Sequence, residues 1–257
     1  MTTPDATLRI AMWSGPRNIS TALMRSFEAR GDCAVVDEPL YAHYLDVTGL
    51  QHPGREQTLA SQERDWRAVT DWLGGAVPGG KPVWYQKHMA HHLLPIVGRD
   101  WLDSLRHAFL VREPEAMLTS LIEVWPEPTL EDTGLPQQVE LFERLTEEAG
   151  AIPAVVDSVE LLRDPAGVLA QLCERLGLAY TERMLSWPAG PRSTDGVWAP
   201  HWYASVERST GFAPVREKQA RVPERLSGLL DRCRELYSRL APHRLRATTA
   251  PLGGGAR

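Results

Sequence analysis

Five short apolar segments of the chain are each followed by side chains that could bind an anion or move a proton. The apolar segments span residues 8–13, 33–36, 82–86, 107–111 and 154–156. The polar groups that follow them, in the same order, are Ser14 to Thr21, Asp37–Glu38, Lys87–His88, Arg112 and Asp157–Ser158. Apolar runs of this length are typical of buried parallel strands, and ligands of such sheets bind beyond the carboxyl ends of the strands. The sequence therefore predicts one polar cleft, with Arg17, Lys87 and Arg112 as candidate anion ligands.

The first of these turns has the composition of an anion-binding loop. It reads Ser14-Gly15-Pro16-Arg17-Asn18-Ile19-Ser20-Thr21 and leads from a strand into a helix. Backbone N–H groups of such a turn and the start of the helix attract negative charge, and Arg17 adds a cation. The second Gly and the Lys of a nucleoside-triphosphate loop are missing. The turn therefore predicts a phosphate site without the usual Mg²⁺-triphosphate arrangement, and an ordinary turn with a helix cap is the alternative.

The apolar segments alternate with helical patterns, which indicates βαβ units. The expected helices cover residues 19–30, 57–73, 102–105, 115–124, 164–176 and 223–240. Residues 186–222 show no strong periodicity and are rich in Trp, Pro and Gly. We predict a single α/β domain over residues 1–246, with a mostly parallel central sheet flanked by helices, and a disordered tail at 247–257.

Composition limits the classes of partner. The 257 residues carry a formal net charge of −5, which argues against a broad nucleic-acid or membrane surface. No apolar run of about 18 residues occurs, and the first residues lack the pattern of a signal peptide. Cys33, Cys173 and Cys233 are an odd, scattered set, typical of buried thiols in a reducing compartment. We expect a cytoplasmic protein without nucleic-acid or membrane partners, and the oligomeric state stays open.

The order of the motifs resembles that of sulfotransferases that use 3′-phosphoadenosine 5′-phosphosulfate (PAPS), in particular bacterial sulfotransferase-like proteins. In that family a basic residue is followed three and four residues later by hydroxyl residues, as Arg17 is by Ser20 and Thr21. A second family element is a strand, an Arg, a Pro and then a Ser eight residues after the Arg, which Arg112 and Ser120 match. The resemblance covers about residues 8 to 178. It implies a P-loop-like sulfotransferase fold, a 5′-phosphosulfate site at residues 14–21 and a 3′-phosphate site at Arg112 and Ser120.

The resemblance also implies a base for the transfer, and two residues are candidates. The segment from Gln86 to Pro95 resembles the catalytic histidine element and supplies His88. Glu38 resembles the acidic base of bacterial and Golgi-type members. We favour His88 as the base, because its ordinary pKa lies near neutral pH. Glu38 either orients or charges His88 or is itself the base. The family's Lys two residues before the His is replaced by Gln86, and on a regular strand Lys87 would point to the opposite face.

Other readings of the same residues stay open. His88, His91 and His92 have spacings that suit zinc on a helix, but no HExxH pattern accompanies them, so we predict no metal. Residues 198–203 are candidates for a lid over the acceptor, for an adenine contact or for a hydrophobic plug over the end of the sheet. We expect Trp125 and Trp187 to be packing residues. The expected function is metal-independent transfer of a sulfuryl group from PAPS to a hydroxyl or amine of a small molecule, with Arg17, Lys87, His88 and Glu38 as catalytic candidates. A nucleotide-dependent kinase and a catalytically silent binder of adenosine 3′,5′-bisphosphate are the alternatives.

Overall fold

A five-stranded parallel sheet forms the centre of the molecule in the computed structural model, which describes residues 7–215 and 221–248. Its strands are β1 (Leu8–Ser14), β2 (Cys33–Asp37), β3 (Val83–Met89), β4 (Arg106–Val111) and β5 (Ala154–Asp157). The order is β2-β3-β1-β4-β5, and all neighbouring pairs are parallel. The predicted strands and the predicted α/β class are confirmed. The chain builds outward from both sides of β1, which makes the end of β1 the switch point where ligands of such sheets bind.

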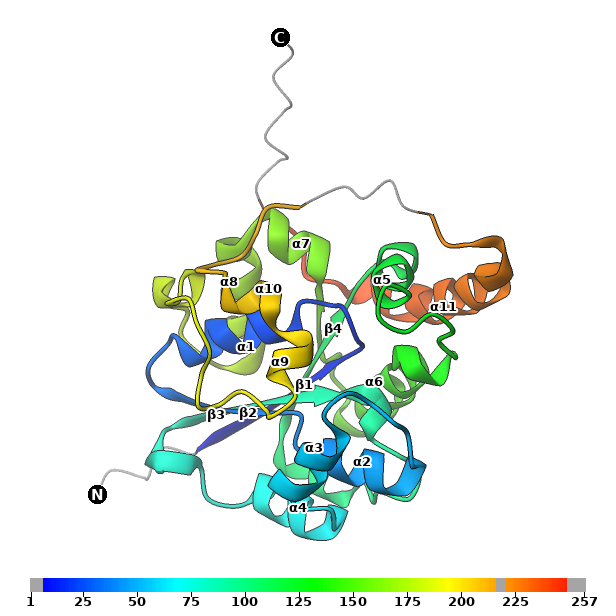
Figure 1. The fold of residues 1–257 in the computed structure, drawn as a ribbon. Coiled ribbons are helices and arrows are strands. Elements are labelled where there is room, and N and C mark those ends of the chain that lie inside the picture. Colours follow the sequence, from blue (N-terminus) through cyan, green and yellow to red (C-terminus); the bar gives the residue numbers. More distant parts are fainter. Residues whose placement is uncertain (1–6, 216–220, 249–257) are drawn as a thin grey trace, which may run out of the picture.

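The helices fall into layers on the two faces of the sheet (Figure 1). One core packs α1 (Ser20–Glu28) and α8 (Pro165–Leu176) on one face, and another packs α4 (Trp66–Gly74) and α6 (Leu135–Ala149) on the other. The remaining helices are α2 (Tyr41–Thr48), α3 (Arg55–Ser61), α5 (Pro114–Leu121), α7 (Ser158–Arg163), α9 (Ala199–Trp202), α10 (Ala204–Glu207) and α11 (Ser227–Leu240). Of the short 3-10 turns, η2 (Ala90–His92) and η4 (Glu131–Thr133) adjoin the site.

Some predicted helix boundaries are wrong. The helix expected over 57–73 is two helices, because the chain turns after α3 and Asp65 starts α4 by accepting a hydrogen bond from the Arg67 N–H. The helix expected at 102–105 is a 3-10 turn at Asp100–Ser104. Helices α2, α6, α7, α9 and α10 lie where no helix was predicted.

The predicted disorder of residues 247–257 is wrong at its start. The Ala247 N–H donates to Oε2 of Glu160 at 2.9 Å, and Thr248 donates from both its N–H and its hydroxyl to Asp164. These bonds attach the two residues to α7 and to the start of α8. Residues 249–257 lie outside the described residues.

The structure also bears on the cysteines and on membrane-spanning helices. All three cysteines are buried and free, as the sequence predicts. Within the described ranges, no helix combines the length and apolar character that a membrane crossing requires.

Candidate active site

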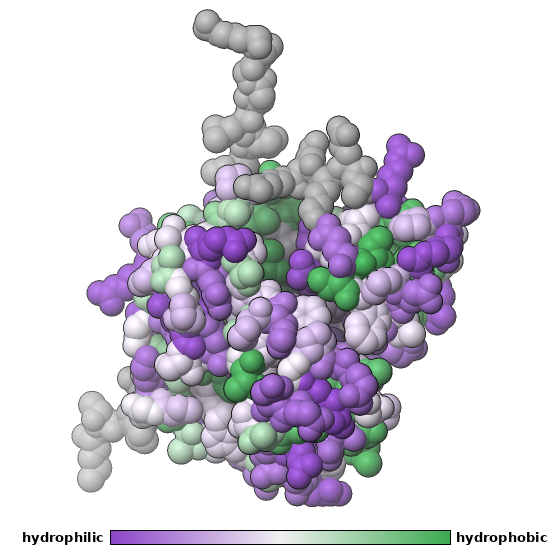
Figure 2. Space-filling model, viewed as in Figure 1, coloured by the Kyte–Doolittle hydropathy of each residue, from purple (hydrophilic) through white to green (hydrophobic). Residues whose placement is uncertain are grey.

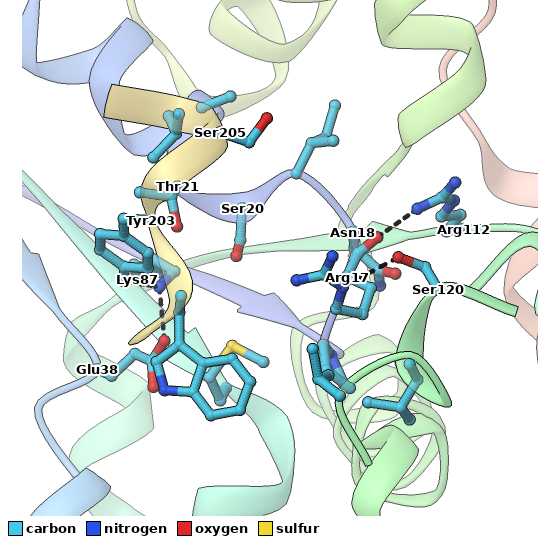
Figure 3. A pocket seen from close by; sticks show the side chains of 18 of the residues that line it. Arg17, Asn18, Ser20, Thr21, Glu38, Lys87, Arg112, Ser120, Tyr203 and Ser205 are labelled. Carbon is cyan, nitrogen blue, oxygen red and sulfur yellow. Dashed lines mark hydrogen bonds and ion pairs between the residues drawn. The ribbon is translucent and has the colours of Figure 1, made fainter. Parts of the chain in front are cut away.

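A cavity of 380 Å³ opens where the β1–α1 loop, the end of β3 and the segment 198–213 meet. Figure 2 shows a hollow on this face of the molecule, and Figure 3 shows the side chains from close by. Its lining includes Pro16 to Thr21, Glu38, Tyr41, Tyr44, His52, Lys87, His91, His92, Arg112, Ser120, Trp125, Asp132, Trp198 and Tyr203. Residues that follow β1, β2, β3 and β4 therefore line one cavity, whereas Asp157 and Ser158 at the end of β5 do not.

The β1–α1 loop has an unusual backbone. Arg17 and Ile19 have φ angles of 61° and 62°, in the left-handed region that side chains other than glycine rarely adopt. A Cβ at Gly15 would lie 2.3 Å from the carbonyl oxygen of Thr133, so only glycine fits where the loop packs against η4. Strained non-glycine residues cluster at functional sites because the surrounding structure has to hold them.

The start of α1 faces the cavity without a side-chain cap. Leu23 makes the first intrahelical bond, to the Ile19 carbonyl, so the amides before it have no partner in the helix. Asn18 donates from Nδ2 to the Leu110 carbonyl at 3.2 Å, while its buried Oδ1 has no partner among the described residues. This helix end can accept an anion.

Two arginines from distant segments meet at this loop (Figure 3). Arg17 donates from Nε to the Ser120 hydroxyl at 3.0 Å, and Arg112 donates from Nη1 to the Arg17 carbonyl at 2.7 Å. Neither guanidinium forms an ion pair within residues 7–215 and 221–248. Burial lowers the pKa of Arg112, and the neighbouring charge of Arg17 lowers it further. The Glu113, Asp157 and Glu123 carboxylates partly oppose this decrease. Two close cations that form no ion pair among the described residues can bind an anion.

The predicted loop residues do not all reach the cavity. Pro16 to Thr21 line it, whereas Ser14 and Gly15 do not. The Ser14 hydroxyl donates to the Gly15 carbonyl within the loop itself. Ser14 and Gly15 shape the loop, and the residues after them face the cavity.

Lys87 is the centre of a buried polar network. Its ammonium donates to Oδ1 of Asp37 at 2.7 Å, to Oε1 of Glu38 at 2.6 Å and to the Tyr203 hydroxyl at 2.8 Å. Burial alone would lower the pKa of Lys87, but the Asp37 and Glu38 carboxylates raise it well above its ordinary value. Lys87 is therefore a fixed cation with all three of its N–H donors in use.

Glu38 is the carboxylate that this network presents to the cavity. Its φ of 44° is again left-handed, which turns the chain sharply at the end of β2. Oε2 lies 3.9 Å from Nδ1 of His92 and is not bonded to Lys87. Burial raises the pKa of Glu38, while the Lys87 charge opposes that rise. A carboxylate with one oxygen held and a raised pKa is suited to accept a proton.

The position of His88 does not fit its predicted role as base. His88 is buried on the other face of β3, where its ring stacks on Trp13 with 4.4 Å between the centroids. Burial, with a smaller effect of His107, lowers the pKa of His88 to about 3. Its Nε2 lies 3.3 Å from Oε1 of Gln86, and it does not line the cavity. His88 is a packed core residue.

The alternation of β3 explains this difference. The strand continues to Met89, so Gln86 and His88 share one face and Lys87 lies on the other. Gln86 donates to the Leu73 carbonyl at 2.9 Å, away from the cavity. Lys87 points to the face opposite to that of His88, as expected of a regular strand, and this is the face that carries the cavity.

The three histidines whose spacing in the sequence suits zinc do not share a helix. His88 lies in β3, and His91 and His92 lie in η2. Among the described residues, no group of three His, Cys, Asp or Glu side chains is arranged to hold a metal ion.

The segment with α9 and α10 covers the cavity. The Tyr203 hydroxyl donates to Oδ2 of Asp37 at 2.6 Å, and the Gly196 N–H donates to the same oxygen at 3.2 Å. The Trp198 indole in turn donates to the Tyr203 hydroxyl at 3.2 Å. Asp37 thus attaches the cover to the sheet from behind the cavity.

Trp125 and Trp187, both predicted to be packing residues, lie in different environments. Trp125 lines the cavity, whereas Trp187 packs against Phe212 with 5.1 Å between ring centroids. The cavity wall therefore contains an aromatic residue that sequence reasoning missed.

A family model described as "Sulfotransferase domain" matches residues 8–233, which include every element that lines the cavity. The chain belongs to the sulfotransferase domain family. Two relatives from Arabidopsis thaliana, branched-chain-amino-acid aminotransferase-like proteins 1 and 2, are 39% and 36% identical to it over 235 residues. The matches cover 91% of this chain but only 42% and 41% of those proteins.

Solved sulfotransferase structures share the fold of this domain. The sulfotransferase domain of the Synechococcus PCC 7002 olefin synthase superposes with a TM-score of 0.59 at 17% identity, covering 93% of this chain and 97% of that one. The sulfotransferase from Alicyclobacillus acidocaldarius superposes with a TM-score of 0.52 at 15% identity, covering 93% and 96%. The predicted family and fold are confirmed.

Within this sulfotransferase domain, the cavity offers two kinds of chemistry. Around Arg17 and Arg112 it can bind anionic groups, and at Glu38 it can accept a proton. The predicted arginines and the predicted Glu38 thus line one cavity, together with Lys87.

Proposed function

We propose that this domain transfers a sulfuryl group from PAPS to a hydroxyl or amine of a small molecule, without a metal ion. The observation that carries the proposal is the pairing of Arg17 with Arg112 beside the uncapped start of α1. PAPS carries phosphate groups at both ends of its ribose, and two cations plus free helix amides match such a ligand.

The donors of the loop and of the end of β4 match the two ends of PAPS. Arg17, Ser20, Thr21 and the first amides of α1 would hold the 5′-phosphosulfate, while Arg112 and Ser120 would hold the 3′-phosphate. Arg17 is bonded to the Ser120 hydroxyl, so binding would exchange that neutral partner for phosphate oxygens. The Asn18 Oδ1, buried without a partner among the described residues, can accept a hydrogen bond from a ligand.

The proton of the acceptor would pass to Glu38. When bound, PAPS supplies the sulfuryl group, whose bond to the phosphate oxygen breaks as the acceptor oxygen or nitrogen bonds to sulfur. Glu38 takes the proton that the acceptor loses, on the oxygen that Lys87 leaves free. Lys87 holds the other oxygen in place, and Arg17 balances the negative charge that grows on the leaving phosphate.

The names of the plant relatives do not change this proposal. Those proteins are called aminotransferase-like, but this chain matches less than half of their length. The match lies in the sulfotransferase domain, and the cavity residues belong to that domain.

The direct test is incubation of the full chain with PAPS and a panel of alcohols, phenols and amines. Adenosine 3′,5′-bisphosphate and a sulfated acceptor, detected together by mass spectrometry, are the expected products. Binding of the bisphosphate without turnover of any acceptor would instead identify a silent binder. Thermal protection by ATP-Mg²⁺, without protection by adenosine 3′,5′-bisphosphate, would identify a kinase.

A further inference from the structure

One wall of the cavity combines aromatic rings with an acidic side chain. Four rings, those of Tyr44, His52, His91 and Trp125, line the cavity together with the carboxylate of Asp132. Tyr44 and His91 meet edge to face at 5.2 Å between centroids, and His52 and Trp125 meet at 5.1 Å. We call these five residues the aromatic subsite.

Asp132 keeps one oxygen available. Its Oδ2 accepts from the N–H and the hydroxyl of Thr129 at 2.8 and 2.9 Å, which fixes the carboxylate on η4. Oδ1 makes no hydrogen bond, and the carboxylate makes no ion pair, within the described part of the chain. A half-buried carboxylate on a cavity wall is therefore left without a cation.

The imidazoles of the subsite do not supply the missing positive charge. Burial lowers the pKa of His91 to about 4 and also lowers that of His52, although the Asp132 carboxylate partly opposes both shifts. Both rings are therefore neutral near pH 7. Nδ1 of His91 is buried with no partner among the described residues, so the ring has a polar atom free for a ligand.

Lys87 and the arginines do not neutralise Asp132 either. Lys87 is bonded to two other carboxylates, and Arg17 and Arg112 are bonded to Ser120 and to the loop. The subsite thus offers one unpaired negative charge, neutral hydrogen-bonding rings and aromatic faces. That combination attracts an organic cation, which gains from both the carboxylate and the ring quadrupoles.

We propose that the aromatic subsite binds a protonated amine, so that the acceptor is a compound carrying an ammonium group in addition to its nucleophilic hydroxyl. This inference rests on the proposed sulfuryl transfer, because it assigns the acceptor of that reaction. The residues between the subsite and Glu38 are aromatic: Tyr41 stacks on His92 at 4.6 Å, and His92 approaches Glu38. The hydroxyl would lie at Glu38 while the ammonium lies at Asp132.

The test compares two phenols that differ in the ammonium group alone. Tyramine and 4-ethylphenol are titrated into the full chain in the presence of saturating adenosine 3′,5′-bisphosphate, and their dissociation constants are compared. We expect tyramine to bind about tenfold more tightly, which corresponds to about 1.4 kcal/mol from charge and cation–π attraction. The preference should shrink as ionic strength rises.

The variant Asp132→Asn removes the charge and leaves an amide oxygen for Thr129. We expect it to abolish the preference for tyramine and to leave the affinity for 4-ethylphenol and for the bisphosphate unchanged. Asp71→Asn, at an exposed carboxylate of α4, is the matched control and should keep the preference.

Three outcomes would overturn the inference. They are equal affinity for the two phenols, a preference that survives Asp132→Asn, and no binding of tyramine while the bisphosphate binds. Failure of the proposed function itself looks different: adenosine 3′,5′-bisphosphate would then not bind, or it would bind while neither phenol is sulfated in the presence of PAPS, whatever their relative affinities.

Discussion

Arg112 donates a hydrogen bond from Nη1 to the carbonyl oxygen of Arg17 at 2.7 Å. The bond joins the end of β4 to a loop residue that is 95 positions earlier and has a left-handed backbone. It fixes the loop in a conformation that a residue other than glycine rarely adopts, and it brings a second guanidinium to the same wall. The anion site is thus built before any ligand arrives, which lowers the entropic cost of binding.

Replacing Glu38 by Gln should remove the base and leave the nucleotide site intact. We expect kcat to fall by about 100-fold or more, the range typical of a lost general base. The affinity for adenosine 3′,5′-bisphosphate, measured by calorimetry, should change little. Glu174→Gln, at an exposed position of α8, is the control and should retain full activity.

The raised pKa of Glu38 also sets the pH dependence of the rate. The proposed base is active as a carboxylate, so kcat/KM should fall as pH drops through the pKa of Glu38. Because burial raises that pKa, the loss should begin above the ordinary value of about 4.3. A pH profile whose acid limb is unchanged in Glu38→Gln would contradict the assignment.

The variant Tyr203→Phe should loosen the cover. It removes a hydroxyl that bonds to Asp37, Lys87 and Trp198, and leaves buried polar groups without a partner, at a cost of about 1–3 kcal/mol. We expect a several-fold rise in KM for the acceptor and a lower melting temperature. Tyr180→Phe is the matched control, since the Tyr180 hydroxyl has no partner among the described residues. Equal effects of the two substitutions would argue against a specific attachment.

His88 should affect stability rather than chemistry. Its folded-state pKa of about 3 lies below its ordinary value, so between these values the unfolded state binds a proton that the folded state does not. Titration of His88 therefore leaves the free energy of unfolding unchanged above a pH of about 6.5. As pH falls from there toward the folded-state pKa, it lowers the free energy of unfolding by about 1.4 kcal/mol per pH unit.

The substitution His88→Gln should flatten that dependence. Urea unfolding between pH 4.5 and 6 should show a slope smaller by about 1.4 kcal/mol per pH unit, because one titrating group is gone. Sulfuryl transfer at neutral pH should persist in the folded fraction. A variant that folds normally but is inactive would restore His88 as the base.

Gly15→Ala tests the packing of the loop against η4. A Cβ there would lie 2.3 Å from the Thr133 carbonyl oxygen, so loop or turn has to move. We expect the free energy of unfolding to fall by about 1–3 kcal/mol and the affinity for adenosine 3′,5′-bisphosphate to fall with it. Gly228→Ala, where nothing lies within 4 Å of the added carbon, should not destabilise the protein. Equal stability of the two variants would contradict this account of the loop.

The sheet could be predicted from the sequence because each strand is a short apolar run that ends in a turn or a polar residue. The same local reasoning missed α6, although Val139, Phe142 and Leu145 follow a helical spacing after Gly134 and Pro136. It merged α3 and α4, because the polar break between them lacks Gly and Pro. Helix boundaries of this kind depend on capping by single side chains such as Asp65.

That Arg17, Ser120 and Arg112 lie together could be predicted because these residues stand at fixed spacings within two motifs. Which of Glu38 and His88 lines the cavity could not be predicted, because the answer depends on which face of β3 the cavity occupies. A strand buried on both faces carries no sequence signal for that choice, since all of β3 from Val83 to Met89 is buried. The aromatic subsite was equally hidden, because η2, η4 and α2 meet only in the folded chain.

Calorimetric titration of adenosine 3′,5′-bisphosphate is the measurement that tests the central claim most directly. The unmodified chain should bind one equivalent, and Arg112→Ala should bind about 10- to 100-fold more weakly, as the loss of a charged hydrogen bond implies. Arg106→Ala, at the exposed start of the same strand, should bind normally. No heat with the unmodified chain, or unchanged affinity in Arg112→Ala, would contradict the account.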